Sequence, residues 1–497
     1  MLDDPAAPAP VLEKAAQGYR TTVTTQAIRL LCKVVSVVVL ARLVSPHDHG
    51  LFAMASSAFA LIALFRDGGL STAAVQAREL NEVQRNTLFW VHFFLGGVLA
   101  AITLVIAPWT ARFYAAPAVT SLLTWMSLGF VLIGTGGFMR AQLYRNMRFH
   151  DANRLETISA VAGTIGMVLV GAIAANAYAF VAFLLISEAT ATGLAWRCQS
   201  WRPTQFPAWR SLRPLLRTGR NLTLHQLAEA LLLQLDTLAI GRWFGAYPLG
   251  LYNRASQLIT LPGIYLVGPL GQIMLATLAR LAPQSPEFKR HAWGSVTAIA
   301  HLILPLFAVC IALPAFSVQL VLGPEWLEAA PLIRILAIGG IGVMLTSLAY
   351  SITVALGHAH RLVVSTAIAL PVTGLAIWIG STHGVVGIAS GVAIANLGLA
   401  LPRVWWLLRE LPGGGFQFLR ALRGPCLTST TLYLGISVTA AAISTEMDWV
   451  ARASGALVGG LALLAGLGFF SGSLRQEWKS ALQLLPSPLK LPPPPSP

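Results

Sequence analysis

Apolar runs of about 20 residues recur from end to end of this chain and are separated by short polar segments. Each run is long enough to cross a bilayer as a helix, and none shows the two-residue alternation of a barrel strand. The pattern predicts fourteen membrane-spanning helices, of which the first and seventh are the least apolar because they carry charges. Their predicted centres lie near Val34, Ala60, Leu95, Leu128, Ile165, Leu184, Leu231, Ile264, Leu304, Gly342, Leu370, Ala393, Leu432 and Ala462.

Composition supports this interpretation. The 497 residues are 56% hydrophobic and only 11% charged, whereas a soluble chain is about one-quarter charged. The predicted fold class is therefore an all-α polytopic membrane protein. The first 18 residues lack the basic start and short apolar core of a signal peptide, so we expect residues 1–17 to form a tail. A second tail, rich in proline, is expected at 473–497.

The basic residues orient the predicted helices. The formal net charge is +15, which by itself suggests a nucleic-acid partner. If the N-terminus is cytoplasmic, however, most of the 34 basic residues fall in cytoplasmic segments. The opposite loops then hold only Arg42, Arg112, Arg242 and Arg452. This distribution predicts both termini in the cytoplasm and no nucleic-acid partner.

Two segments, 20–57 and 220–257, match each other at an offset of 200 residues. Eight aligned positions are identical, including the Gly-Leu pair at Gly50 and Gly250. Six predicted helices separate the copies, so both have the same orientation, as in transporters built from parallel repeats. The match predicts two six-helix lobes, 18–200 and 212–410, followed by a helix pair at 418–472.

Polar side chains share one face of the first predicted helix. Thr22, Gln26, Arg29, Lys33 and Ser36 follow a 4-3-4-3 spacing, which places them along one stripe. Two cations one turn apart repel each other, and an anion between them relieves the repulsion. The stripe indicates an anion site, suited to a phosphate or diphosphate. The alternative is that Arg29 snorkels or pairs with an acid of a neighbouring helix.

The seventh predicted helix carries acids instead. Asn221, His225, Glu229 and Asp236 form a similar stripe, in which the acids are candidates for binding a coupling proton or sodium ion. Alternatively, these acids pair with Arg29 or Lys33, and Asp236 serves as a local hydrogen-bonding group. Arg254, at the start of the eighth helix, is a further cavity candidate.

Two other acids, Glu156 and Glu188, lie near predicted membrane edges, and we expect them to pair with nearby arginines. The run His47-Asp48-His49 does not have the spacing of a metal site, and the four cysteines are scattered singly. Glycines Gly339 to Gly342 are not followed by Lys-Ser/Thr, so they indicate close helix packing rather than a phosphate loop. We expect no metal and no cofactor.

Three segments carry a family resemblance: "LARLVSPHDHGLFAMASS…" from Leu40 to Gln76, "GRNLTLHQLAEALLLQLD…" from Gly219 to Leu281, and "LGPEWLEAAPLIRILA" from Leu322 to Ala337. Here the chain resembles the polysaccharide flippases, the Wzx-type lipid-linked-oligosaccharide transporters of the multidrug/oligosaccharidyl-lipid/polysaccharide superfamily. The likeness covers roughly residues 18–472.

The resemblance implies two lobes around a central cavity that opens alternately to each side of a bacterial cytoplasmic membrane. It also implies a substrate of sugars on a polyprenyl diphosphate, moved to the outer leaflet for surface polysaccharide biosynthesis. Membrane lipids, a polysaccharide polymerase and export machinery are the implied partners. Arg29 and Lys33 match the family's basic cavity residues by position, with Gln26 and Arg254 as further candidates.

Two other functions remain open at this point. A cation-coupled multidrug exporter of the same superfamily would depend on Glu229 and Asp236. A membrane polymerase or glycosyltransferase needs acids or bases in a substantial outer loop, and the outer loops here are short. We therefore expect a transporter rather than an enzyme.

Overall fold

The computed structural model describes residues 9–470 apart from 67–80, 206, 208–212, 284, 359, 412 and 444–448. Every regular element in these residues is helical, which confirms the all-α prediction. Contacts between residues divide the chain into two compact units, Met1–Gly250 and Leu251–Pro497.

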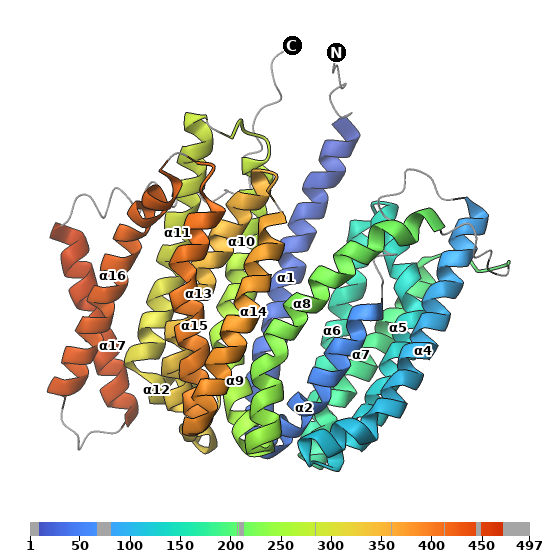
Figure 1. Cartoon of the computed structure of the whole chain (residues 1–497), viewed down its shortest axis with the longest axis horizontal. Coiled ribbons are helices and arrows are strands. Elements are labelled where there is room, and N and C mark those ends of the chain that lie inside the picture. Colours follow the sequence, from blue (N-terminus) through green and yellow to red (C-terminus); the bar gives the residue numbers. More distant parts are fainter. Residues whose placement is uncertain are drawn as a thin grey trace. The chain divides into compact units, whose positions relative to one another are not determined.

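The first unit contains the helices coloured blue to green in Figure 1. They are α1 (Ala9–Leu43), α2 (Pro46–Ala63) with the 3-10 turn η1 (Leu64–Arg66), α4 (Glu82–Tyr114), α5 (Ala118–Arg145), α6 (Phe149–Ala174), α7 (Tyr178–Cys198) and α8 (Arg213–Phe244).

The second unit begins within α9 (Ala246–Pro262). A π-helical turn, η3 (Gly263–Val267), joins α9 to α10 (Gly268–Leu278). There follow α11 (Pro286–Ala312), α12 (Pro314–Val321), η4 (Pro324–Ala329), α13 (Ala330–Ala355), α14 (His360–Gly380), η5 (Ser381–His383), α15 (Gly384–Leu407), α16 (Gly414–Ala442) and α17 (Trp449–Phe470).

All fourteen predicted centres lie inside these helical segments, with Ile264 in the π-helical turn. Within the described residues, nine segments are long and apolar enough to cross a membrane. Neither α1 nor α8 is among them. Both helices form nonetheless, since their polar positions keep a helical spacing and the remaining positions are apolar.

Glycines allow the helices to pack closely within each unit. Helices α4 and α5 cross where a Cβ on Gly96 would lie 2.6 Å from the Phe130 carbonyl oxygen. In the second unit, a Cβ on Gly342 of α13 would lie 2.4 Å from the Asn396 carbonyl oxygen of α15. Only small residues permit backbones to approach this closely in a membrane, so the expected packing role of the glycines around Gly339 is confirmed.

The two repeat segments meet each other inside the first unit. A Cβ on Gly50 would lie 1.7 Å from the Ala246 carbonyl oxygen, and one on Gly250 would lie 1.8 Å from the Pro46 carbonyl oxygen. Pro46 and Ala246 are equivalent positions at the 200-residue offset. Each of these two glycines therefore faces a backbone carbonyl of the other copy, and the two contacts are equivalent.

Candidate functional site

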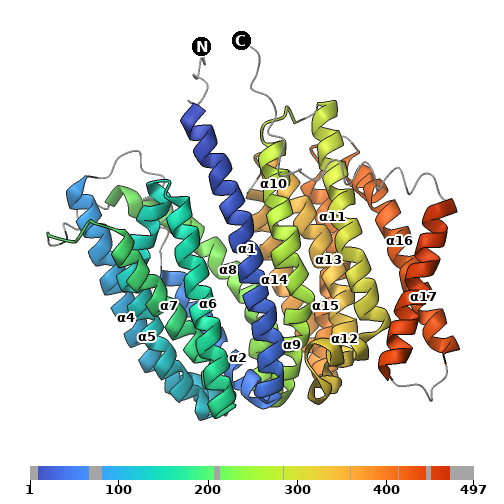
Figure 2. The same ribbon diagram turned by 180° about the vertical axis from the view of Figure 1, so that it is seen from behind.

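The polar stripe of α1 meets a carboxylate of α6, and Figure 2 shows these two helices side by side. Arg29 Nη1 donates a hydrogen bond to Glu156 Oε2 at 2.6 Å. The side chains are 38% and 32% exposed, so the pair is neither sealed in the protein nor fully solvated. The expected pairing of Glu156 with an arginine is confirmed, and Arg29 has the neighbouring-helix partner that one interpretation of the sequence foresaw.

Further polar groups of α5 and α7 extend this pair into a network. The Tyr144 hydroxyl donates a hydrogen bond to Glu156 Oε1. One turn away on α5, Arg140 Nη2 lies 3.0 Å from Glu188 Oε2 of α7, in the geometry of an ion pair rather than a hydrogen bond. Arg29 and Arg140 both act electrostatically on Tyr144. Two cations, two anions and a phenol thus connect α1, α5, α6 and α7.

Sequence reasoning missed Tyr144 and Arg140 as members of this network. Their spacing of four residues on α5 puts them on one helical face, and that was the available signal. Tyr144 lies at the end of α5, where a tyrosine is ordinary at a membrane interface.

The other stripe residues of α1 have different surroundings. Gln26 is exposed and Lys33 is half-buried. Ser36 is buried and donates to the Cys32 carbonyl oxygen at 2.6 Å, so its hydroxyl bonds within its own helix. Arg29 and Lys33 are therefore the cations that this face presents.

The α8 stripe is only partly described. The side chains of Asn221 and His225 lie outside the described residues, and Glu229 is exposed. Asp236 is half-buried, and its Oδ1 accepts a hydrogen bond at 2.7 Å from the backbone N–H of Thr237. The interpretation of Asp236 as a local hydrogen-bonding group agrees with this contact. The ion-pair partner of Arg29 is on α6 rather than on α8, the seventh predicted helix.

Arg254, in the second unit, is 6% exposed and its Nη1 donates to Gln257 Oε1, three residues along α9. Asp48 and His49, in the first turn of α2, have structural roles. Ser45 caps α2 by accepting from the Asp48 N–H at 3.2 Å, and the Asp48 carboxylate accepts from its hydroxyl. The His49 ring contacts the Ser45 carbonyl oxygen at 2.9 Å.

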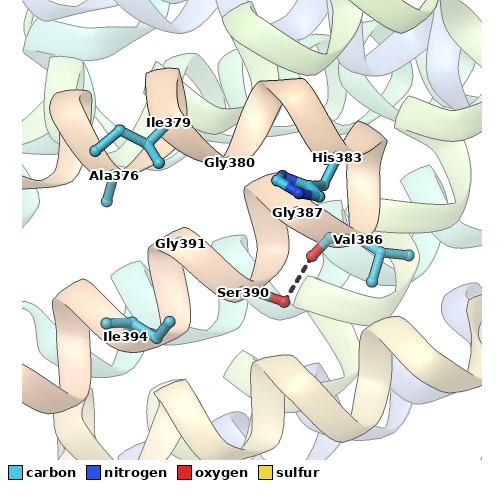
Figure 3. Close-up of a pocket in the computed structure, with 9 residues that line it drawn as sticks. All are labelled: Ala376, Ile379, Gly380, His383, Val386, Gly387, Ser390, Gly391 and Ile394. Carbon is cyan, nitrogen blue, oxygen red and sulfur yellow. Dashed lines mark hydrogen bonds between the residues drawn. The ribbon is translucent and has the colours of Figure 1, made fainter.

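A groove of about 480 Å³ lies between α14 and α15 in the second unit, and Figure 3 shows its lining. Apolar and small residues dominate it, including Ala376, Ile379, Gly387 and Ile394. Its Ser390 hydroxyl already donates to the Val386 carbonyl oxygen at 2.8 Å. With no Lys or Arg in its lining, the groove is unsuited to an anionic ligand group.

A comparison with protein families decides the chain's membership. The model of a family described as "Polysaccharide biosynthesis protein" matches residues 39–331, more than half of the chain. The chain belongs to this polysaccharide biosynthesis family. The resemblance drawn from the sequence is thereby confirmed, and the family is one of transporters rather than enzymes.

Individual relatives agree with the family. The chain is 23% identical to "Lipopolysaccharide biosynthesis protein WzxC" of Escherichia coli (strain K12), over 66% of this chain and 67% of the relative. The structure of "Lipid II flippase MurJ, inward closed conformation" superposes with a TM-score of 0.73 at 14% identity, covering 91% of this chain and 98% of that one.

A second solved structure has the same fold. An inward-facing multidrug resistance MATE family transporter of the MOP superfamily gives a TM-score of 0.60 at 15% identity, covering 81% of this chain and 98% of that one. At these identities the structures establish the fold alone. Family and fold together describe a multi-pass membrane transporter of a bacterial type that is involved in polysaccharide biosynthesis and has the same fold as these solved transporters.

Proposed function

We propose that this protein flips lipid-linked oligosaccharides, built on a polyprenyl diphosphate, across the bacterial cytoplasmic membrane by alternating access. The observation that carries this proposal is the cationic face of α1, where Arg29 and Lys33 lie one turn apart. Family membership supports it, as do the names of the relative WzxC and the lipid II flippase of the same fold.

The chemistry of the α1 face fits a diphosphate. A guanidinium can donate two parallel hydrogen bonds to phosphate oxygens, and an ammonium adds a compact positive charge. Arg29 is partly exposed, so a ligand can reach it. The diphosphate would bind Arg29 and Lys33, the sugars would occupy polar space near Gln26, and the prenyl chain would stay in lipid. No covalent bond is formed or broken.

The 200-residue repeat suggests how the rest of the transporter would be arranged. The lobes 18–200 and 212–410 would enclose the substrate path, with Arg254 contributing from the second lobe and both termini in the cytoplasm. A polysaccharide polymerase and the export machinery would receive the flipped unit on the outer side. These features are expectations of the proposed mechanism.

Cation-coupled drug export is the weaker alternative, although it shares the fold. The positive charges of Arg29 and Lys33 would repel cationic drugs. Asp236 is already held by the backbone N–H of Thr237. Glu229 and His225 would serve ion coupling in either mechanism.

The test is alanine substitution of Arg29 and Lys33 in a strain that lacks the native gene. We expect surface polysaccharide to fall to the level of the deletion strain and lipid-linked units to accumulate, because the diphosphate loses its cationic partners. Arg42→Ala is the matched control, since Arg42 is an exposed arginine on the same helix. Normal export by the Arg29/Lys33 double variant, at normal abundance in the membrane, would refute the proposal.

A further inference from the structure

Glu156 occupies the position on Arg29 that an anionic ligand would take. Its Oε2 lies 2.6 Å from Arg29 Nη1, a short charge-assisted hydrogen bond. A carboxylate and a phosphate present the same acceptor oxygens to a guanidinium. Ligand and carboxylate therefore compete for the same donor.

The exposure of the pair makes such an exchange feasible. Roughly a third of each side chain is accessible, so an incoming anion need not open a packed core. Neither side chain is sealed inside the protein, so the carboxylate has room to move away from Arg29. A diphosphate carries more negative charge than a carboxylate and can displace it.

The displaced carboxylate keeps a partner on another helix. Tyr144 of α5 already donates its hydroxyl to the second oxygen, Oε1 of Glu156. Arg140 lies one turn away on the same face of α5 and acts electrostatically on Tyr144. Glu156 can thus release Arg29 without being left as an isolated charge, which would be costly in a membrane-spanning segment.

We propose that Glu156 is the release residue of the diphosphate site: it holds Arg29 while the site is empty, yields it to the ligand, and competes for it again when the ligand leaves. This inference rests on the proposed function, because it takes Arg29 to be a diphosphate-binding residue. Glu156 is thereby a positioning residue that acts on the ligand through Arg29.

The experiment measures binding of two probes, inorganic pyrophosphate and farnesyl diphosphate, to the full-length protein in nanodiscs by calorimetry. Glu156→Gln removes the competing charge, so the dissociation constant should fall about two- to fivefold, the range expected for a partly exposed ion pair. Export in cells should fall at the same time, because the ligand is released more slowly. If only farnesyl diphosphate binds, the site requires the lipid chain as well as the diphosphate.

Asp151→Asn is the matched control, since Asp151 is a carboxylate on the same helix that pairs with Arg148 and not with Arg29, and it should leave both dissociation constants unchanged. Glu156→Asp shortens the carboxylate's reach and should tighten binding to a smaller extent, which tests the idea even if Glu156→Gln fails to fold. Binding that requires Arg29 but is not tightened by either Glu156 variant would overturn the inference alone. Absence of binding by the unaltered protein, or binding unaffected by Arg29→Ala, would overturn the proposed function.

Discussion

At the scale of single residues, two arginine–glutamate pairs have contrasting surroundings. Arg29 and Glu156 are similarly exposed, whereas Arg361 is 3% exposed and its partner Glu410 is 47% exposed. Arg361 Nη2 donates to Glu410, while Nε and Nη1 find no acceptor among the described residues. The first pair can exchange partners, but the second compensates a buried charge that has few other contacts.

We predict that Glu410→Gln lowers the thermal stability of the purified protein, because it removes the carboxylate that compensates Arg361. Glu325→Gln is the control, since Glu325 is an exposed acid with no ion pair among those of the described residues. Thermal unfolding in detergent at neutral pH measures the difference. Equal midpoints for the two variants would contradict the structural role of Glu410.

The same pair predicts a dependence on pH. The hydrogen bond and charge of Arg361 hold the pKa of Glu410 below its ordinary value. A depressed pKa in the folded state means that the contribution to stability is complete above the unfolded pKa, about 4.3, and is lost as the pH falls through the folded value. The stability difference between the unaltered protein and Glu410→Gln should therefore be largest near neutral pH and shrink in acid, as urea titrations can show.

At the scale of helices, the repeat contact between the start of α2 and the start of α9 is the tightest feature. Gly50 and Gly250 each face a backbone carbonyl of the opposite copy, at Ala246 and Pro46 respectively. Two helix starts can approach this closely only without side chains at these positions. The contact explains why the Gly-Leu pair is shared by both copies when the charges between are not.

We predict that Gly50→Ala or Gly250→Ala destabilises this arrangement by about 1–3 kcal/mol, the usual cost of overpacking, and reduces polysaccharide export. The added methyl would have to push apart two backbones that belong to different copies. Gly97→Ala serves as control, because nothing lies within 4 Å of a Cβ at that position of α4. Export assays and thermal unfolding should show a loss in Gly50→Ala and Gly250→Ala but not in Gly97→Ala. Equal export and equal unfolding midpoints in all three variants would contradict the importance of the contact.

At the scale of the whole molecule, the orientation in the membrane remains a prediction from charge. The cytoplasmic end of α5 is expected at Arg145 and its outer end at Ala118. Both ends have exposed positions, at Asn146 and at Ala118 itself. One helix therefore offers a labelling site on each side of the membrane.

In a variant without the four native cysteines, we predict that Ala118→Cys reacts with a membrane-impermeant maleimide on intact cells. Asn146→Cys should react only after the cells are made permeable, because positive segments remain on the cytoplasmic side. Gel shifts of the labelled protein report the result. The reverse pattern would place both termini outside and contradict the predicted orientation.

The sequence by itself determined where the helices lie. Bilayer-length apolar runs dictate helices because backbone groups in lipid must bond within their own segment, and every predicted centre falls in a helical segment. Helical periodicity also determined that Gln26, Arg29 and Lys33 share a face. The three segments that resemble the family, 40–76, 219–281 and 322–337, all overlap the residues 39–331 that the family model matches.

Only the tertiary structure decided which groups meet. Arg29 and Glu156 are 127 positions apart, and the sequence offered acids on α8 as equally reasonable partners. Periodicity specifies which residues point the same way but not which neighbouring helix that face contacts. That choice depends on the packing of α1 against α6, which no local pattern encodes. The reciprocal contact of Gly50 with Ala246 was likewise hidden, since a matched pair of glycines does not reveal that the two copies touch.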